Sequence, residues 1–289
     1  MEKPFICLQT DFGLHWGAVS SMHGVIASID PALQVRDLCH LIPKFQSWAA
    51  SFCLSYTMPC WPAGTVFVSV VDPGVGTARK ACAAKTGNGQ YVITPDNGTL
   101  THVKALLGID EVREIDETVN RRPGTDKMNT FHGRDLFAYT AGRLAGGIID
   151  FSGVGPAYPV EEILVFPLEP PVKGKGFIQG IIAGTDHHFG NPSTNITIAD
   201  FESLGLGYGD SVLVTITRES PAGNREVFKR PVLYHRSFGY AGIGEPVVYN
   251  GSTGYMLLGL NQASMTDAYS IEAGADWKIR FDKLAGNQP

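Results

Sequence analysis

The chain has 289 residues, of which 44% are hydrophobic and 18% are charged, and its formal net charge is −5. This composition excludes global disorder, and the lack of a dense basic block argues against a nucleic-acid partner. No apolar run approaches the ~18 residues of a membrane span, so no membrane partner is expected. The N-terminus does not resemble a secretory signal, and the five cysteines form no C-x-x-C pair. We therefore expect a soluble cytoplasmic protein with reduced thiols.

The first half of the chain alternates short apolar runs with helical stripes. Strands are predicted at 6–8, 35–38, 65–71 and 91–94, and helices at 17–29, 46–57 and 134–145. This alternation predicts an α/β domain with a mainly parallel sheet over residues 1–165.

The second half has a different character. Five prolines fall between residues 155 and 176, and helical periodicity nearly vanishes beyond them. Short β-rich segments, separated by glycine-rich turns, predict strands at 177–183, 211–217, 246–249, 255–258 and 277–281. We therefore expect a smaller all-β, barrel-like domain over residues 172–289.

Three carboxylates directly follow predicted strands: Asp11, Asp72 and Asp96. Ligands of open α/β sheets bind outside the carboxyl ends of the strands. Each aspartate also fits an ordinary turn, because Asp-Pro-Gly and Asp-Asn-Gly are favourable turn sequences. The segment 71–79 is more specific, since its glycines allow close approach of a ligand and it carries both Asp72 and Arg79. It lacks the lysine and hydroxyl residue of a phosphate-binding loop.

Histidines stand out at two places. His132 precedes the predicted helix at 134–145, where the positive end of the helix dipole favours a neutral imidazole. Taken alone, His132 is better explained as an ordinary loop histidine than as a catalytic one. His187 and His188 are adjacent, and adjacent residues on a strand point to opposite faces, so we expect no shared metal ion there.

Seven motifs together resemble one known family, the S-adenosyl-L-methionine (SAM) hydrolases that form adenosine. These proteins are also called SAM hydroxide adenosyltransferases and are relatives of fluorinase and chlorinase. The motifs occur in the family's order at 10–13, 37–40, 71–79, 95–98, 130–135, 186–191 and 251–255 with 261–264. The resemblance implies an α/β domain, a β-barrel-like domain and a homotrimer with active sites between subunits. It also implies hydrolysis of SAM to adenosine and L-methionine without a metal or cofactor.

The resemblance also implies roles for individual residues. Asp72, Arg79 and His132 match the residues that hold and activate the water attacking ribose C5′. Asp11 matches the carboxylate that binds the ribose hydroxyls. Asp186 matches the acid that pairs with the methionine ammonium, and Asn191 matches the amide that binds adenine. Ser252, with Thr253 beside it, matches the hydroxyl that binds the methionine carboxylate.

Some positions depart from the halogenating relatives. Those relatives carry Tyr and Ser where this chain has Asp72 and Gly133, so the sequence follows the water-using pattern. Trp16, Gly17 and Ala18 replace their methionine-holding residues, and Lys44 replaces an aromatic ribose wall. Two alternatives stay open: a non-catalytic protein that binds adenosine or SAM, suggested by residues 16–18, and a halide-using transferase, which Asp72 and Gly133 oppose.

Overall fold

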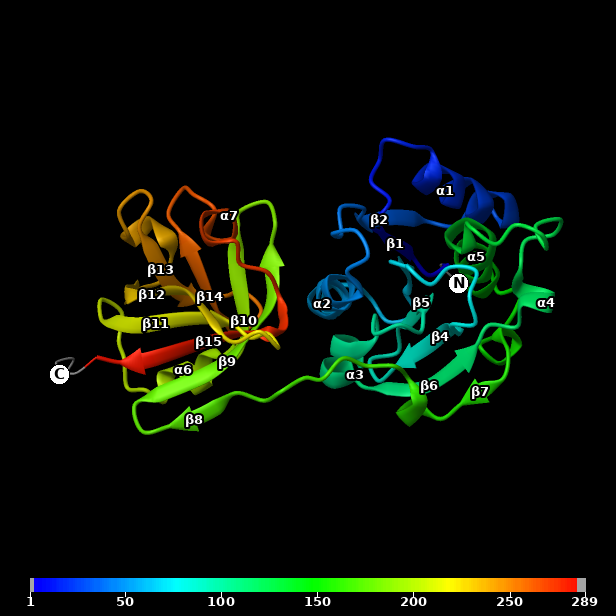
Figure 1. The fold of residues 1–289 in the computed structure, drawn as a ribbon. Helices are drawn as coiled ribbons and strands as arrows, with labels where there is room; N and C mark the ends of the chain where they lie inside the picture. The colour runs from blue at the N-terminus through cyan, green and yellow to red at the C-terminus, as the bar shows by residue number, and fades with distance from the viewer. Residues whose placement is uncertain (1–2, 285–289) are drawn as a thin grey trace. The chain divides into compact units, whose positions relative to one another are not determined.

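The computed structural model describes residues 3–284, and the chain divides into two compact units between Phe166 and Pro167 (Figure 1). The first unit contains a seven-stranded sheet with the order β2-β1-β3-β5-β4-β6-β7. Its strands are β1 (Ile6–Thr10), β2 (Val35–Cys39), β3 (Val66–Val70), β4 (Ala81–Thr86), β5 (Tyr91–Pro95), β6 (Ile109–Glu114) and β7 (Ala157–Tyr158). β2, β1, β3 and β5 run parallel, whereas β4, β6 and β7 join antiparallel. The predicted α/β class is confirmed.

Helices cover both faces of this sheet. Ile6 and Leu8 of β1 pack with Met22 of α1, whereas Cys7 between them packs with Leu54 of α2. This split follows from the two-residue period of a strand. The helical segments are α1 (Ala18–Ile29), α2 (Ser47–Thr57), α3 (Thr101–Leu107), α4 (Glu117–Asn120) and α5 (Tyr139–Ala145), the π-helical η2 (Gly133–Ala138), and short 3₁₀ turns at Met58–Cys60, Ser152–Val154 and Val160–Glu162.

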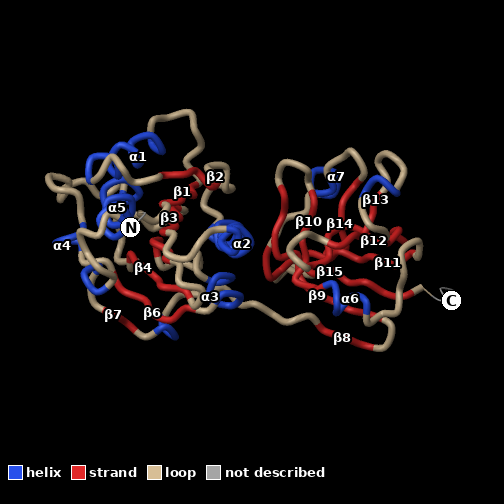
Figure 2. Tube along the Cα trace, turned by 180° about the vertical axis from the view of Figure 1, so that it is seen from behind, coloured by secondary structure: helices blue, strands red, loops and turns tan. Residues whose placement is uncertain are grey.

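The second unit is a closed β-barrel, again as predicted. Strands β10, β14, β13, β12, β11, β15 and β9 form a ring that the β9–β10 pairing closes, and β8 adds to β9. Alternate residues such as Val212, Val214 and Ile216 point into a core that contains Phe201 and Trp277. Figure 2 shows that strands dominate this unit. Its elements are β8 (Val172–Gly174), β9 (Phe177–Asp186), β10 (Asn191–Thr197), α6 (Ile198–Glu202), β11 (Ser211–Arg218), β12 (Arg225–Tyr234), a 3₁₀ turn (Phe238–Tyr240), β13 (Pro246–Asn250), β14 (Tyr255–Leu260), α7 (Met265–Tyr269) and β15 (Gly274–Lys283).

Every strand and helix predicted from the sequence is present, but several elements were missed. β4 is rich in alanine and β12 carries many charges, so neither has the composition of a typical strand. β6, β10 and α3 were missed as well. The predicted helix at 134–145 begins with the π-helical turn η2, a feature often found at functional sites. No helix within residues 3–284 is long and apolar enough to cross a membrane.

Candidate active site

All three strand-end carboxylates lie at the same edge of the first sheet, because β1, β3 and β5 run parallel. β1 and β3 are parallel neighbours that pair Thr10 with Val70. Asp11 follows β1 directly and Asp72 follows the end of β3 closely, so both lie at the carboxyl ends of adjacent strands. This is the edge at which open α/β sheets bind ligands.

Asp72 forms a two-pronged ion pair with Arg79. The Arg79 Nε donates to Asp72 Oδ1 at 2.9 Å, and its Nη2 donates to Oδ2 at 2.5 Å. The two side chains are only 5% and 10% exposed. The connecting loop is pressed against residue 129, since a Cβ at Gly76 (φ +75°) would lie 2.7 Å from the Asn129 carbonyl oxygen. Only glycine fits there, so the loop geometry depends on this residue.

His132 completes the cluster. Its Nδ1 lies 3.0 Å from Arg79 Nη2, and the residue immediately precedes η2. Burial, followed by the nearby Arg79 charge, lowers the pKa of His132 below its ordinary 6.5. The structure therefore brings the three predicted catalytic residues together, with a neutral imidazole at neutral pH.

Arg121 belongs to the same network, although the sequence analysis did not single it out. Its Nη2 lies 3.1 Å from His132 Nε2 and also pairs with the Glu117 carboxylate. The chain of contacts thus runs from Asp72 through Arg79, His132 and Arg121 to Glu117. An arginine pair in a loop gives no local signal of such a role, because the contact depends on how the loop folds back.

Asp11 is held by a backbone contact. Its Oδ2 accepts from the Phe45 N–H at 2.9 Å, and Phe45 has a φ of +67°. A carboxylate has about four acceptor sites, so this bond leaves capacity for ribose hydroxyls. Lys44 precedes Phe45 and therefore lies in the same loop as this contact.

The third strand-end carboxylate has another environment. Asp96 is 3% exposed, and its two oxygens accept from the Tyr158 hydroxyl at 3.0 Å and from the Leu164 N–H at 2.9 Å. Burial raises the pKa of Asp96. Both oxygens thus anchor β7 and the chain after it. The role is structural, as the turn interpretation expects, but the bonds go to these distant residues and not to the turn at 96–98.

In the second unit, Asp186 and Asn191 face each other. They pair at the end of the β9–β10 hairpin, and Asp186 Oδ1 accepts from the His188 N–H at 2.9 Å. A Cβ at Gly259 would lie 2.5 Å from the Asn191 amide oxygen, so this glycine makes room for Asn191. The strand placement assumed for His187 and His188 is wrong: both lie in the turn that the Asp186 carboxylate stabilises.

Ser252 and Thr253 lie elsewhere in the barrel. They occupy the exposed turn before β14. The carbonyl oxygen of the next residue, Gly254, accepts from the N–H of Ile198, which directly follows β10. Because β10 and β14 are antiparallel, Asn191 packs near the far end of β14. The structure therefore separates Ser252 and Thr253 from Asp186 and Asn191 by the length of one strand.

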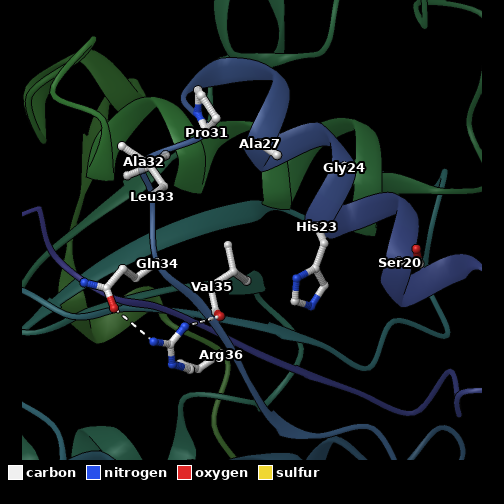
Figure 3. A pocket seen from close by; sticks show the side chains of 10 residues that line it. All are labelled: Ser20, His23, Gly24, Ala27, Pro31, Ala32, Leu33, Gln34, Val35 and Arg36. Carbon is white, nitrogen blue, oxygen red and sulfur yellow. Dashed lines mark hydrogen bonds between the residues drawn. The ribbon is translucent and has the colours of Figure 1, made fainter.

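A pocket of about 610 Å³ lies between α1 and β2, away from this edge (Figure 3). His23 on its wall bonds Asp37 at 2.7 Å, and Asp37 also lies 3.1 Å from His40 Nε2. The His40 Nδ1 lies 2.8 Å from the Thr10 hydroxyl, next to Asp11. The motif at 37–40 thus supports the end of β1, and the pocket contains no predicted site residue.

Known proteins resemble both units of the chain. Residues 6–155 match the SAM hydroxide adenosyltransferase N-terminal domain, and residues 180–278 match the corresponding C-terminal domain. A Salinispora tropica protein named (R)-S-adenosyl-L-methionine hydrolase is 35% identical over 274 residues, which cover 94% of this chain and 95% of that protein. A fluorinase from Actinopolyspora mzabensis is 29% identical over 96% of this chain and 97% of its own.

A solved structure extends the likeness to three dimensions. The crystal structure of an uncharacterized conserved protein from Thermotoga maritima superimposes with a TM-score of 0.85 at 33% identity. The match covers 96% of this chain and 100% of that one. The sequence motifs and the fold therefore point to the same family.

Proposed function

The chain belongs to the SAM hydroxide adenosyltransferase family, and on this premise we propose that it hydrolyses S-adenosyl-L-methionine to adenosine and L-methionine. The observation that carries the proposal is the Asp72–Arg79–His132 cluster at the ligand-binding edge of the sheet. Because several relatives are named for the (R) form, we include in the proposal a preference for the (R) epimer at sulfur.

The reaction is a displacement at ribose C5′. The water oxygen bonds to C5′ as the C5′–S bond breaks, and its electron pair leaves with methionine as a neutral thioether. The positive charge of the sulfonium is lost when the thioether forms. One proton of the water is therefore released as adenosine and methionine form. Asp72 accepts that proton or a hydrogen bond from the water, while Arg79 and His132 donate to the developing hydroxide.

No metal or cofactor is part of this proposal. A neutral thioether needs no acid to leave, so the chemical difficulty lies in the water, whose unassisted pKa is about 15.7. A preorganised group of one acceptor and two donors addresses that difficulty directly. Asp11 would hold the ribose, Asn191 the adenine and Asp186 the methionine ammonium. The methionine carboxylate is on the same carbon as the ammonium, so Ser252 and Thr253, which lie a strand length from Asp186, are left out of the proposed site.

The test is a product analysis. Purified protein is incubated with separated (R)- and (S)-SAM in halide-free buffer with EDTA, and products are followed by chromatography. Equal amounts of adenosine and methionine, formed faster from the (R) epimer, are expected. If SAM is consumed only after a metal ion is added, the metal-free mechanism is contradicted.

Two other functions give different results in the same assay. A non-catalytic binding protein, suggested by Trp16, Gly17 and Ala18 in place of methionine-holding residues, would bind adenosine and leave SAM intact. A halide-using transferase would form 5′-halogenated adenosine in halide buffer. Gly133 opposes a halide-using function. The halogenating relatives carry serine at this position, whereas here even a Cβ at residue 133 would lie 3.1 Å from the Phe12 ring.

We also propose a cytoplasmic homotrimer with active sites between subunits. Support comes from three large apolar side chains that are exposed around the Asp11 loop, namely Trp16, Leu41 and Phe45. The five cysteines are all free thiols. Sedimentation equilibrium tests the assembly: a monomer of 31.1 kDa would contradict it.

A further inference from the structure

Arg121 is a buried guanidinium that ties α4 to the loop carrying His132. Its side chain is 9% exposed, and its Nε donates to Glu117 Oε2 at 3.1 Å. Its Nη1 donates to the Met128 carbonyl oxygen at 3.3 Å, within the same loop. With the 3.1 Å contact from Nη2 to His132 Nε2, these bonds fix the position of the guanidinium.

His132 lies between two groups that can only donate. Arg79 Nη2 is 3.0 Å from its Nδ1, and Arg121 Nη2 is 3.1 Å from its Nε2. A neutral imidazole has one N–H and one acceptor nitrogen, whereas a guanidinium has no acceptor. Only one of the two contacts is therefore a hydrogen bond to the neutral ring.

The two ring nitrogens of His132 differ in whether an acceptor can reach an N–H on that side. Arg79 and Arg121 are both buried and each is held by its own carboxylate, so an N–H on either side of the ring faces a fixed donor. On the Nε2 side, Arg121 is tied to Glu117 and to the loop, and this side lies away from the cluster assigned to the attacking water. On the Nδ1 side lies Arg79, in the cluster assigned to the attacking water. The attacking water, placed at hydrogen-bond distance from both Nδ1 and Arg79, would accept from each of them. The tautomer protonated at Nδ1 is thus the one whose N–H finds an acceptor during catalysis.

We propose that Arg121 is a positioning residue. It does not contact the substrate, but it fixes His132 as the Nδ1–H tautomer, which directs an N–H at the attacking water. This inference rests on the proposed hydrolysis. The charged groups that face the ring are Arg79 and Asp72 on one side and Arg121 and Glu117 on the other. Each arginine is matched by its own carboxylate, so the tautomer is set by hydrogen-bond direction rather than by net charge.

The test reads the tautomer directly, by ¹⁵N NMR of the histidine rings, with His132 assigned through a His132→Gln variant. In the wild type we expect a protonated Nδ1 and an unprotonated Nε2. Arg121→Met should reverse this pattern and lower kcat about 10- to 100-fold, less than the 10²–10³ lost on removing a transition-state donor outright. KM should change little, because Arg121 acts through His132. Arg121→Lys, which keeps a donor, should restore the Nδ1–H tautomer and part of kcat.

Arg122→Met is the matched control. Arg122 is the next residue, is 45% exposed and faces Asp135 rather than His132, so tautomer and kcat should stay as in the wild type. An Nε2–H tautomer in the wild type, or an unchanged tautomer in Arg121→Met, overturns the proposal. If Arg121→Met does not fold, the wild-type spectrum and Arg121→Lys decide. A wild type that leaves SAM intact refutes the proposed function, and the tautomer measurement reports on the ring independently of that result.

Discussion

Asp72 and Asp96 follow neighbouring parallel strands of one sheet, yet they have opposite surroundings. Asp72 meets a guanidinium that approaches from its own loop and, through it, His132. Asp96 meets two neutral donors, the Tyr158 hydroxyl and the Leu164 N–H, which arrive from a later part of the chain. A carboxylate at the end of a strand therefore becomes a candidate site when charged groups gather around it, and an anchor when neutral donors cover it.

The largest effect is expected from Asp72→Asn. The substitution keeps the shape of the side chain but removes the negative charge that accepts from the water and pairs with Arg79. We expect kcat to fall about 10²- to 10⁴-fold. Adenosine binding, measured by calorimetry, should stay within a few-fold of the wild type. Normal turnover in this variant would remove Asp72 from the mechanism.

Asp96→Asn should show the reverse pattern. The amide nitrogen cannot accept, so one of the two buried bonds is lost and the free energy of unfolding should fall by about 1–3 kcal/mol. Activity at a temperature where the variant is folded should change little. Urea unfolding and steady-state kinetics on the same preparation check both statements, and a large loss of kcat with unchanged stability would contradict the assignment of Asp96 as an anchor.

A second contrast exists in the barrel, between the two ends of β14. Asn191 is buried beside Asp186, whereas Ser252 is exposed in the turn at the opposite end. Asn191→Ala should raise KM about 10-fold, the equivalent of one hydrogen bond of roughly 1.4 kcal/mol. Ser252→Ala should raise it by less. Equal effects would instead show that the substrate reaches both ends of the strand.

The smallest effect concerns pH. Burial raises the pKa of Asp96 above its ordinary 3.8, so the folded protein holds this proton more tightly than the unfolded chain does. The stability that protonated Asp96 contributes is full below about pH 4 and is lost as the pH rises through the raised value. Asp96→Asn should therefore destabilise the protein more at pH 4 than at pH 7. Urea unfolding of both proteins at the two pH values measures the difference, and a larger loss at pH 7 would contradict the sign.

Local signals in the sequence determined most of the fold and the short loop that joins Asp72 to Arg79. The β-branched run at 65–71, the helical stripe at 17–29 and the turn after Asp72 each carry their structure in adjacent residues. The same holds for the segment that places Arg79 seven residues after Asp72, since the loop between them is short. These features need no information from distant parts of the chain.

Only the tertiary structure decided which polar groups meet. The Tyr158 and Leu164 donors reach Asp96 from more than 60 positions along the chain, and Arg121 reaches His132 through a loop without a local signature. The alanine-rich β4 is a strand because β5 and β6 flank it, not because of its own propensity. Local patterns set backbone preference within a few residues, whereas burial and hydrogen-bond partners arise from contacts between distant segments, so these contacts separate the catalytic carboxylate from the structural one.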